Sequence, residues 1–468
     1  MVETVSLTAG GIASTAEGQV IEGDPSTAVE RLSIDSRAIY PGDLFVAIRG
    51  ERFDGHQFVG AAIAGGAVGA IVSTAPAMPR RDPTPVLIRV ADTTRALQDV
   101  ARDVRRRCGT RVVAITGSAG KTTTKEIAAE FLATRYRVFR NKGNLNNHIG
   151  LPLSLMELRA GPDVAVVELG MNHAGEIRTL VGIAEPEVRV WTNVGDAHLG
   201  FFESPDAIAD AKAEILENAR PEHTLIANAG DGRVMTRARQ FEGRLVTFGI
   251  ETVADVQATG VELRGLDGTR AHVRTPAGEI TLETPLLGLG NLSNVLAAAA
   301  AALVFDVPLE TIRDRAATLA PAARRGQLVR LPGGVTLIDD SYNSSPAALR
   351  RALELLASAH GCARKVAVLG EMLELGSHAD RLHQESGRAA ARAGVDILIA
   401  VGGAPARTLA AAAVDAGLSA SNVSHVATKE EAAELALARV RPGDLVLVKG
   451  SRGIGTDLVV ERLQAEYA

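Results

Sequence analysis

The chain has few features that point outside the cytoplasm. Only two of its 468 residues are cysteines, Cys108 and Cys362, which lie far apart and form no metal-ligand spacing. We therefore expect packing thiols in a reducing cytoplasm. The start lacks a charged segment followed by an apolar one, so export is not expected. The longest apolar run, near 296–305, is short and rich in alanine, and predicts no membrane insertion.

Basic charge and lysine are also scarce. The net charge of −5 leaves no basic excess, so a nucleic-acid partner is not expected. The chain is rich in arginine, yet its lysines are only Lys121, Lys125, Lys142, Lys212, Lys365, Lys429 and Lys449. Several of them fall in candidate site segments. Because arginine cannot replace a compact donor or a reactive amine, this placement favours functional lysines, with codon bias as the alternative.

The length and the pattern order predict three α/β domains. The first block covers 1–107 and ends in an arginine cluster at 105–107, which we interpret as a solvated helix face. The second block, 108–320, alternates β-rich runs with helical patterns, and the third block, 321–468, repeats that alternation. Such an alternation predicts parallel sheets that are covered by helices on both faces.

Polar residues come at the ends of several expected strands. The expected strands cover 164–169, 188–193, 225–228, 335–339, 366–369, 397–401 and 445–448. The polar residues at their ends are Glu168, Asn193, Asn228, Asp339 with Asp340, and Lys449. Because ligands of open parallel sheets lie at the carboxyl ends of the strands, these positions predict a binding site.

A glycine loop between an expected strand and an expected helix predicts phosphate binding. The loop and the helix start comprise Gly117, Ser118, Ala119, Gly120, Lys121, Thr122 and Thr123. Its N–H groups and the helix dipole favour an anion, Lys121 can reach the outer phosphates, and the Thr122 hydroxyl can hold Mg²⁺. Ile115 stands where the longer G-x-x-x-x-G-K-[ST] pattern has its first glycine, and a turn without a ligand is the alternative. We expect a protein that handles nucleoside triphosphate.

Three residues outside the loop form a candidate second Mg²⁺ site. Glu168 follows four apolar residues, where a carboxylate is costly unless it is paired or metal-bound. His198 follows the next expected strand, and Lys212 lies on an expected helix. Taken singly, each suits an ordinary structural or surface role. Together with a phosphate loop they predict a metal site, because hard cations take oxygen ligands and substrate phosphates.

Motifs along nearly the whole chain resemble those of the Mur ligases. They read T-G-S-A-G-K-T-T-T-K, N-K-G-N-L-N-N-H-I-G-L-P, E-L-G-M-N-H-A-G-E-I, N-V-G-D-A-H-L, A-K-A-E-I-L, D-D-S-Y-N-S-S-P, L-G-E-M-L-E-L-G and V-K-G-S-R-G. Residues 33–37, 41–45 and 54–56 match the family's uridine-nucleotide-binding domain. The resemblance implies a small α/β N-terminal domain, a central parallel-sheet P-loop ATPase domain and a C-terminal Rossmann-like domain.

The resemblance also implies roles for individual residues. Lys121 would bind the β- and γ-phosphates, and Thr122 and Glu168 would hold the first of two Mg²⁺ ions. Lys212 would be carbamylated and, with His198, would hold the second ion. The other implied nucleotide contacts are Asn291, Asn294, Arg325, Asp340 and Tyr342. The implied substrate contacts are Ser36, Arg37, Asn144, Asn146, Asn147, Lys449, Ser451 and Arg452. Gly290 stands where the family's G-x-H-N-x-x-N segment has a histidine. This chain therefore lacks the histidine that contributes to the adenine contact in the family.

Among Mur ligases, the motifs are most similar to those of the members that join D-alanyl-D-alanine to UDP-N-acetylmuramoyl-tripeptide. That likeness implies an ATP-dependent, acyl-phosphate reaction that gives the pentapeptide, ADP and phosphate for peptidoglycan synthesis. We expect a monomer. The alternatives are the preceding diamino-acid-adding ligase, which usually carries a D-N-P-R segment absent here, and folylpolyglutamate synthase. A non-catalytic nucleotide-binding regulator is a further alternative, but it would not need Glu168, His198 and Lys212 together.

Overall fold

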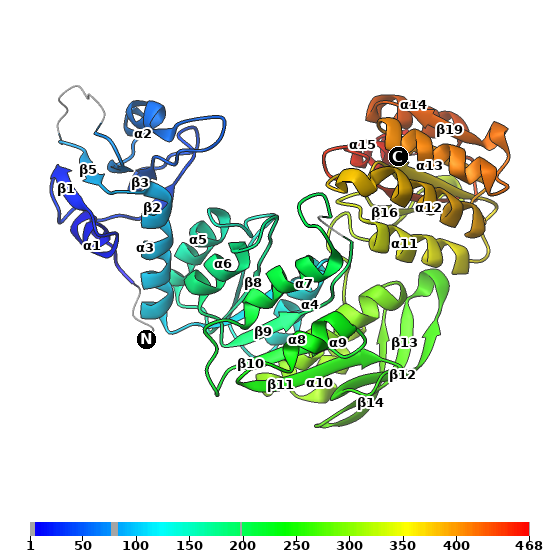
Figure 1. Cartoon of the computed structure of the whole chain (residues 1–468), viewed down its shortest axis with the longest axis horizontal. Coiled ribbons are helices and arrows are strands. Elements are labelled where there is room, and N and C mark those ends of the chain that lie inside the picture. Colours follow the sequence, from blue (N-terminus) through cyan, green and yellow to red (C-terminus); the bar gives the residue numbers. More distant parts are fainter. Residues whose placement is uncertain (1–4, 76–82, 197–198, 468) are drawn as a thin grey trace. The chain divides into compact units, whose positions relative to one another are not determined.

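The chain adopts a three-domain α/β fold. The computed structural model describes residues 5–75, 83–196 and 199–467, whose strands form sheets of five, nine and six strands (Figure 1). Each sheet falls within one of the three blocks expected from the sequence, while the boundaries at 107/108 and 320/321 stay a prediction. The chain divides into two compact units. The first comprises Met1–Ala114, Arg135–Arg189 and Glu214–His223, and the second comprises Ile115–Thr134, Val190–Ala213 and Thr224–Ala468.

The fifteen α-helices occupy the intervals between the strands in most of the chain. They are α1 Ala9–Thr15, α2 Val59–Ala64, α3 Thr93–Cys108, α4 Lys121–Leu132, α5 Gly150–Leu155, α6 Glu176–Ala184, α7 Pro205–Ala213, α8 Gly232–Ala238, α9 Gly288–Val304, α10 Leu309–Ala316, α11 Pro346–Ser358, α12 Ala379–Arg392, α13 Ala404–Asp415, α14 Lys429–Arg439 and α15 Asp457–Glu466 in the described residues. Within these residues no helix is both long enough and apolar enough to cross a membrane. Both cysteines are free and partly buried.

The first sheet has the order β1-β5-β4-β3-β2. Its strands are β1 Gln19–Glu22, β2 Arg31–Ser33, β3 Asp43–Val46, β4 Gly69–Val72 and β5 Val86–Arg89. Strands β2 to β5 pair in parallel, and β1 joins β5 antiparallel at the edge. Phe45, Val72 and Leu87 pack against Val59 and Ile63 of α2, so one small core holds this sheet and its helix together.

The nine-stranded sheet has the order β14-β13-β12-β11-β10-β9-β6-β8-β7. Its strands are β6 Arg111–Thr116, β7 Val138–Arg140, β8 Val164–Glu168, β9 Val188–Trp191, β10 Thr224–Asn228, β11 Arg244–Ile250, β12 Val256–Leu263, β13 Thr269–Thr275 and β14 Gly278–Thr284. Strands β10, β11 and β12 pair in parallel, but β13 and β14 add antiparallel hairpins. Buried and exposed residues alternate along β13 and β14, so one face of these strands is exposed to solvent. Such strands are typical of antiparallel pairing, which makes the sheet mixed.

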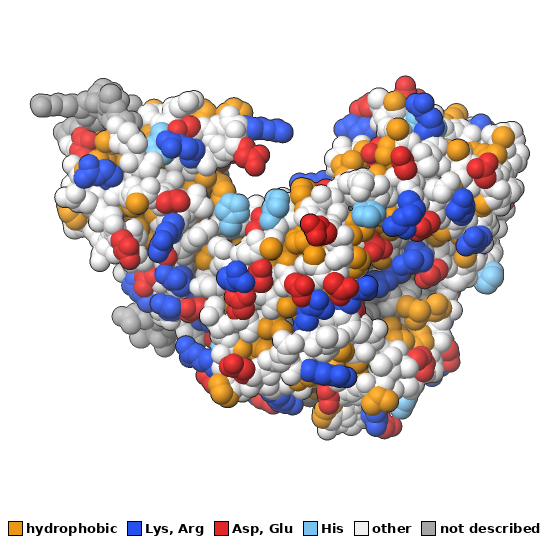
Figure 2. Space-filling model, in the orientation of Figure 1, with side chains coloured by type: hydrophobic (Ala, Val, Ile, Leu, Met, Phe, Trp, Pro, Cys, Tyr) orange, Lys and Arg blue, Asp and Glu red, His pale blue; other side chains and the backbone are white. Residues whose placement is uncertain are grey.

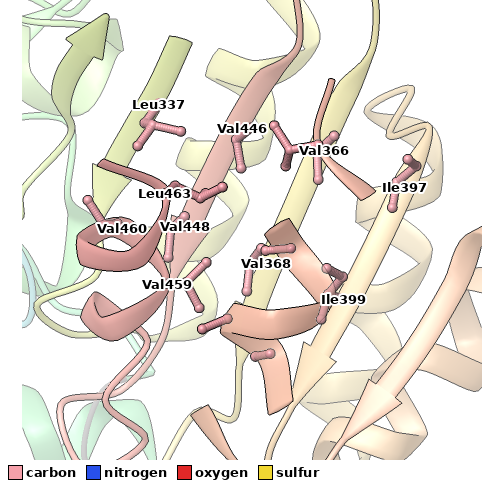
Figure 3. Packing of buried hydrophobic residues seen from close by; sticks show 14 of the residues in the cluster. Leu337, Val366, Val368, Ile397, Ile399, Val446, Val448, Val459, Val460 and Leu463 are labelled. Carbon is pink, nitrogen blue, oxygen red and sulfur yellow. The ribbon is translucent and has the colours of Figure 1, made fainter. Parts of the chain in front are cut away.

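The third sheet has the order β15-β16-β20-β17-β18-β19. Its strands are β15 Gln327–Arg330, β16 Thr336–Asp340, β17 Lys365–Gly370, β18 Ile397–Val401, β19 Val423–Val426 and β20 Leu445–Lys449. All neighbours pair in parallel except β15, which lies antiparallel to β16. Figure 3 shows Val366, Val368, Val446 and Val448 on one face, packed against Val459 and other residues of α15. Their neighbours in the strands point to the opposite face, which explains the near-continuous burial of these strands.

Helix α3 corrects our interpretation of the arginine cluster. Arg105 is buried, and its guanidinium donates to the carbonyls of Ala184 and Glu185 and to Glu187 Oε1 at 2.9, 2.9 and 2.5 Å. The expected solvated face is therefore wrong for Arg105, although Arg107 does lie at the surface beside Asp103. The reason is the position of α3 against α6, which places the last helical turn over uncapped carbonyls.

Arginine serves widely in ion pairs elsewhere. Arg364 holds Asp444 at 2.7 Å, and Arg31 holds Asp43 at 2.6 Å, with each carboxylate almost fully buried. Figure 2 shows that basic and acidic side chains lie interspersed on the visible face, without separation by sign. Both of these pairs are bidentate, a geometry that suits a planar guanidinium.

Candidate active site

The loop between β6 and α4 requires both of its glycines. Gly117 has φ of +149° and Gly120 has φ of +83°. A Cβ on Gly117 would lie 1.9 Å from Thr192 Oγ1, and one on Gly120 would lie 2.2 Å from Asn294 Oδ1. Lys121 begins α4, and its Nζ donates to the Gly117 carbonyl at 2.8 Å. The expected strand, loop and helix are thus present. At both loop glycines the neighbouring side chains lie too close to leave room for a Cβ, so only glycine fits.

Asn193, directly after β9, holds the loop from one side. Its Oδ1 accepts the Ala119 N–H and its Nδ2 donates to the Ala119 carbonyl, both at 2.9 Å. Its own carbonyl accepts the Ser118 N–H at 3.0 Å. The Gly195 N–H donates to Ser118 Oγ at 2.9 Å. These contacts shape the loop without a ligand. From the sequence Asn193 was visible only as a polar strand end, because its partners lie 74 residues away.

Asn291 and Asn294, on the first turns of α9, meet the loop from another direction. Asn294 Oδ1 accepts the Thr124 hydroxyl at 3.2 Å, and Asn294 Nδ2 donates to Asn291 Oδ1 at 3.4 Å. Asn291 Nδ2 donates in turn to the Leu287 carbonyl at 3.0 Å. The structure therefore brings both predicted asparagines next to the phosphate loop, although they follow it by some 170 residues.

Arg325 and Tyr342 lie over the start of α4. The Arg325 guanidinium carbon lies 4.2 Å from the centre of the Tyr342 ring, and its Nη2 donates to Thr122 Oγ1 at 2.9 Å. Arg452 stands over the same ring at 5.7 Å. An arginine stacked on an aromatic face is oriented as well as charged. Here it points at the hydroxyl that was predicted to hold Mg²⁺.

Asp340 and Lys449 meet because β16 and β20 pair in parallel with these residues in register. Lys449 is buried, and its Nζ donates to Asp340 Oδ2 at 2.6 Å and to the Asn343 carbonyl at 2.9 Å. Neighbouring Asp339 accepts the Ser341 N–H and hydroxyl, and burial raises the pKa of its carboxyl. Of the polar strand ends predicted from the sequence, those of β16 and β20 therefore meet, and Asp340 and Lys449 form an ion pair.

A cavity of about 230 Å³ joins these groups. It is lined by the loop residues Ser118, Ala119, Gly120 and Thr123, by Leu287 to Asn291 and Asn294 of α9, and by Arg325, Asp340, Tyr342, Arg351 and Lys449. A second cavity of about 140 Å³ shares Ser118, Ala119 and Arg351 with the first and is also lined by Asn193 and Asp231. Residues of the loop therefore line both cavities.

Ser451 and Arg452 follow β20 and differ in exposure. Ser451 is buried, its Oγ accepts the Leu373 N–H at 2.9 Å, and its N–H donates to the Glu371 carbonyl at 3.3 Å. It thus supports the loop after β17. Arg452 is exposed and reaches Tyr342, so of these two predicted cleft residues Arg452 faces the arginine–tyrosine stack.

Glu168 ends β8 and lies with its own polar neighbours in the first unit. The carboxylate is buried, and Asn146 Nδ2 donates to its Oε1 at 2.8 Å. Its N–H donates to Asn141 Oδ1 at 3.1 Å. Of the other predicted asparagines, Asn147 accepts the N–H groups of Ile149 and Gly150 at the start of α5. Asn144 is exposed.

The donor chemistry fits Mg²⁺. Lys212 lies on α7 as expected and is only 1% exposed. His198 lies outside the described residues. Within 5–75, 83–196 and 199–467, no three His, Cys, Asp or Glu side chains gather as ligands. A hydroxyl, one carboxylate, a carbamate and substrate phosphates would supply the oxygens that Mg²⁺ prefers.

Ser36 and Arg37 lie in the loop after β2 of the first sheet. Arg37 donates from Nε and Nη2 to the Asp35 carboxylate at 2.9 and 2.8 Å. These hydrogen bonds and the Arg37 N–H lower the pKa of Asp35 to about 2. Both predicted substrate residues therefore stand in a turn that the arginine itself closes.

Comparisons with known proteins agree with this arrangement. Three family models match in order: "Mur ligase family, catalytic domain" over 28–105, "Mur ligase middle domain" over 115–302 and "Mur ligase, glutamate ligase domain" over 324–452. A relative from Bacillus subtilis, named UDP-N-acetylmuramoyl-tripeptide–D-alanyl-D-alanine ligase, is 34% identical over 440 residues, or 93% of each chain.

Two solved structures are also similar. The structure of MurF from Acinetobacter baumannii has a TM-score of 0.88 at 32% identity, with 99% of this chain and 100% of that chain covered. The structure of MurF ligase from Thermotoga maritima, in complex with ADP, has a TM-score of 0.83 at 28% identity. It covers 94% of this chain and 98% of that one. The likeness therefore extends over all three sheets.

Proposed function

The chain belongs to the Mur ligase family, and on this basis we propose that it joins D-alanyl-D-alanine to UDP-N-acetylmuramoyl-tripeptide in an ATP-dependent ligation. The products are UDP-N-acetylmuramoyl-pentapeptide, ADP and phosphate, and the reaction belongs to peptidoglycan precursor synthesis. The proposal includes a cytoplasmic, monomeric enzyme. The relatives named for this reaction match nearly the full length of the chain, which supports the whole reaction rather than nucleotide binding alone.

The observation that carries the proposal is the cavity bordered by the glycine loop, α9 and the ends of β16 and β20. A nucleoside triphosphate would place its phosphates against Gly117 to Thr123, at the N-terminus of α4. Lys121 would neutralise charge on the outer phosphates. Arg325, which already reaches Thr122, would lie beside the same phosphates. This arrangement supplies positive charge where phosphoryl transfer needs it.

The proposed reaction has two steps. A carboxylate is a poor electrophile, so one oxygen of the terminal carboxylate of the tripeptide first attacks the γ-phosphorus, and ADP leaves. The amine of D-alanyl-D-alanine then attacks the carbonyl carbon of the acyl phosphate. A C–N bond forms, inorganic phosphate leaves, and the amine loses a proton. Because water would hydrolyse the acyl phosphate, exclusion of water from the site would favour ligation.

Two Mg²⁺ ions are part of the proposal. Thr122 and Glu168 would hold one ion, and His198 with a carbamylated Lys212 would hold the other. Bound Mg²⁺ would reduce the charge repulsion between the carboxylate and the triphosphate. Asn146 donates to Glu168 Oε1, and this would leave the other carboxylate oxygen of Glu168 available to the ion.

The proposed substrate contacts are divided between the other predicted residues. Ser36 and Arg37 would contact the uridine nucleotide, and Asn144 and Asn147 would face the muramoyl peptide. Lys449 would remain paired with Asp340 and would help to shape the nucleotide cavity. Ser451 would act through the loop that it supports.

The test is a reconstitution with defined substrates. The purified chain is incubated with Mg-ATP, UDP-N-acetylmuramoyl-tripeptide and D-alanyl-D-alanine, and phosphate release and product mass are followed. We expect phosphate release that requires both substrates, with the pentapeptide mass. Turnover only with UDP-N-acetylmuramoyl-dipeptide and a free diamino acid would move the assignment to the preceding ligase. Nucleotide binding without turnover on either pair would favour the regulator.

A further inference from the structure

Arg351 of α11 occupies the space above Gly290 of α9. A Cβ built on Gly290 would lie 3.2 Å from Arg351 Cδ, 3.6 Å from its Nη1 and 3.9 Å from its Nε. Any larger side chain at 290 would therefore compete with the arginine for this space. Gly290 has a negative φ within a regular helix, so its backbone does not require glycine. The small residue instead makes room for the arginine.

The Arg351 guanidinium is placed to receive a ligand. It lines both cavities that border the phosphate loop. Within residues 5–75, 83–196 and 199–467, its guanidinium has no hydrogen-bond or ion-pair partner at contact distance, although Glu354 and Asp231 exert a longer-range attraction. Arg351 is exposed, so its guanidinium is open to a ligand that enters either cavity.

The position along α9 indicates which part of a nucleotide Arg351 would meet. Asn294 abuts Gly120 of the phosphate loop, whereas Gly290 lies one helical turn earlier, about 6 Å along the axis. The cavity wall on that side includes Leu287, Leu289 and Leu355. Phosphates need N–H groups and cations, while a nucleobase suits apolar walls and a planar guanidinium.

We propose that Arg351 contacts the nucleobase of ATP, in the space that Gly290 leaves open, and thereby contributes to nucleotide specificity. The proposal rests on the proposed function for the presence of ATP in this cavity. Arg351 acts here as a binding residue for the base, and phosphoryl transfer itself requires only the loop and the residues around it. Its loss therefore weakens nucleotide binding more than turnover at saturating ATP.

The first test compares Arg351→Ala with Arg350→Ala. Arg350 is the adjacent exposed arginine on α11 and lies outside both cavities as the described residues define them. Calorimetry measures the Kd of each full-length protein for Mg-ATP, Mg-GTP and tripolyphosphate. We expect Arg351→Ala to raise the Kd for ATP about five- to tenfold, the effect of one lost cation–π contact, and to reduce the preference for ATP over GTP. The Kd for tripolyphosphate and all values of Arg350→Ala stay at the parental level.

Two results would overturn the proposal. One is a Kd for ATP within twofold of the parent in Arg351→Ala. The other is an equal loss for ATP and tripolyphosphate, which would assign Arg351 to the phosphates. Calorimetry needs no acceptor substrate, so a chain that binds ATP without ligating peptides would refute the proposed function while the affinity ratios still decide the role of Arg351. A parent that binds no ATP would overturn both.

A second pair of variants checks the geometry independently of folding. Gly290→Ala introduces a Cβ 3.2 Å from the Arg351 stem and should displace it, which raises the Kd for ATP. In the Arg351→Ala background the same Gly290→Ala change should have no effect, because the space is vacant. Equal effects of Gly290→Ala in the two backgrounds would contradict the contact.

Discussion

Replacement of Gly120 by alanine should disrupt the phosphate loop by two separable effects. The first is conformational, because Gly120 has φ of +83°, where L-residues are strained. The second is steric, because the new Cβ would lie 2.2 Å from Asn294 Oδ1. Asn294 is buried and cannot move without losing the Thr124 hydroxyl at 3.2 Å.

The structure provides a matched control for the first effect. Gly175 precedes α6 with φ of +88°, as Gly120 precedes α4, but no described atom lies within 4 Å of a Cβ placed there. Gly175→Ala should therefore cost only the left-handed backbone penalty, about 1–2 kcal/mol. Gly120→Ala pays that penalty and also breaks a buried hydrogen bond, about 1–3 kcal/mol more. The expected total is about 2–5 kcal/mol.

Hydrogen exchange of the helix that follows each glycine is the suitable assay, because a chain of three domains does not unfold as one two-state system. Exchange free energies of α4 in Gly120→Ala and of α6 in Gly175→Ala are compared with the parent. The Kd for ATP should rise at least tenfold in Gly120→Ala, since loop N–H groups are displaced, and stay unchanged in Gly175→Ala. Equal losses in both helices, with parental ATP affinity, would refute the steric argument.

Three further predictions concern other parts of the molecule. Arg105→Ala should destabilise α3 by about 2–4 kcal/mol because it leaves buried acceptors unpaired, whereas exposed Arg107→Ala should cost less than about 0.5 kcal/mol. Hydrogen exchange of α3 compares them, and equal losses would contradict the burial argument. His383 is buried, donates from Nδ1 to the Ala379 carbonyl and accepts the Met372 N–H at Nε2. Burial lowers its pKa below the ordinary 6.5, so the unfolded segment binds the proton more readily and stability should decline as the pH falls below 6.5. When the exchange free energy of α12 is measured from pH 5 to 7.5, His383→Gln should show a smaller dependence on pH, and an unchanged dependence would contradict this. Lys212→Ala should nearly abolish ligation with the fold intact, with partial rescue by short carboxylic acids; full activity would exclude the carbamate.

Local patterns were sufficient for much of the fold. The strands β8, β16, β18 and β20 were predicted within one or two residues, because buried parallel strands are short apolar runs with polar ends. The glycine loop was equally clear. Alternation in β13 and β14 was not used, although it marks an antiparallel edge. Arg105 was misinterpreted because nothing in its own segment reveals the carbonyls at 184 and 185 that it caps.

The residues of the site also differ in whether local sequence patterns could predict them. Residues that were placed at strand ends, such as Asp340 and Lys449, do meet, because parallel register aligns them. Asn193 and Arg351 were not assigned roles, since their importance depends on contacts with segments 60 to 74 residues or more away. The metal site at Glu168, His198 and Lys212 was predicted from these residues beside a glycine loop. Their division between two ions and the carbamylation of Lys212 came from the resemblance to a family, and all of these roles stay predictions.

The distinction between a phosphate loop and an idle glycine turn depends on residues outside the loop. Within the loop, the shortened T-G-x-x-G-K-T-T pattern leaves both interpretations open. Thr192 and Asn294 add a steric argument, because each excludes a side chain at one loop glycine. Asn193 adds hydrogen bonds to both backbone groups of Ala119. A turn without a ligand would gain little from such restraint, whereas a rigid loop avoids the entropy cost of becoming ordered when phosphate binds. The supporting side chains therefore argue for function more strongly than the loop sequence does.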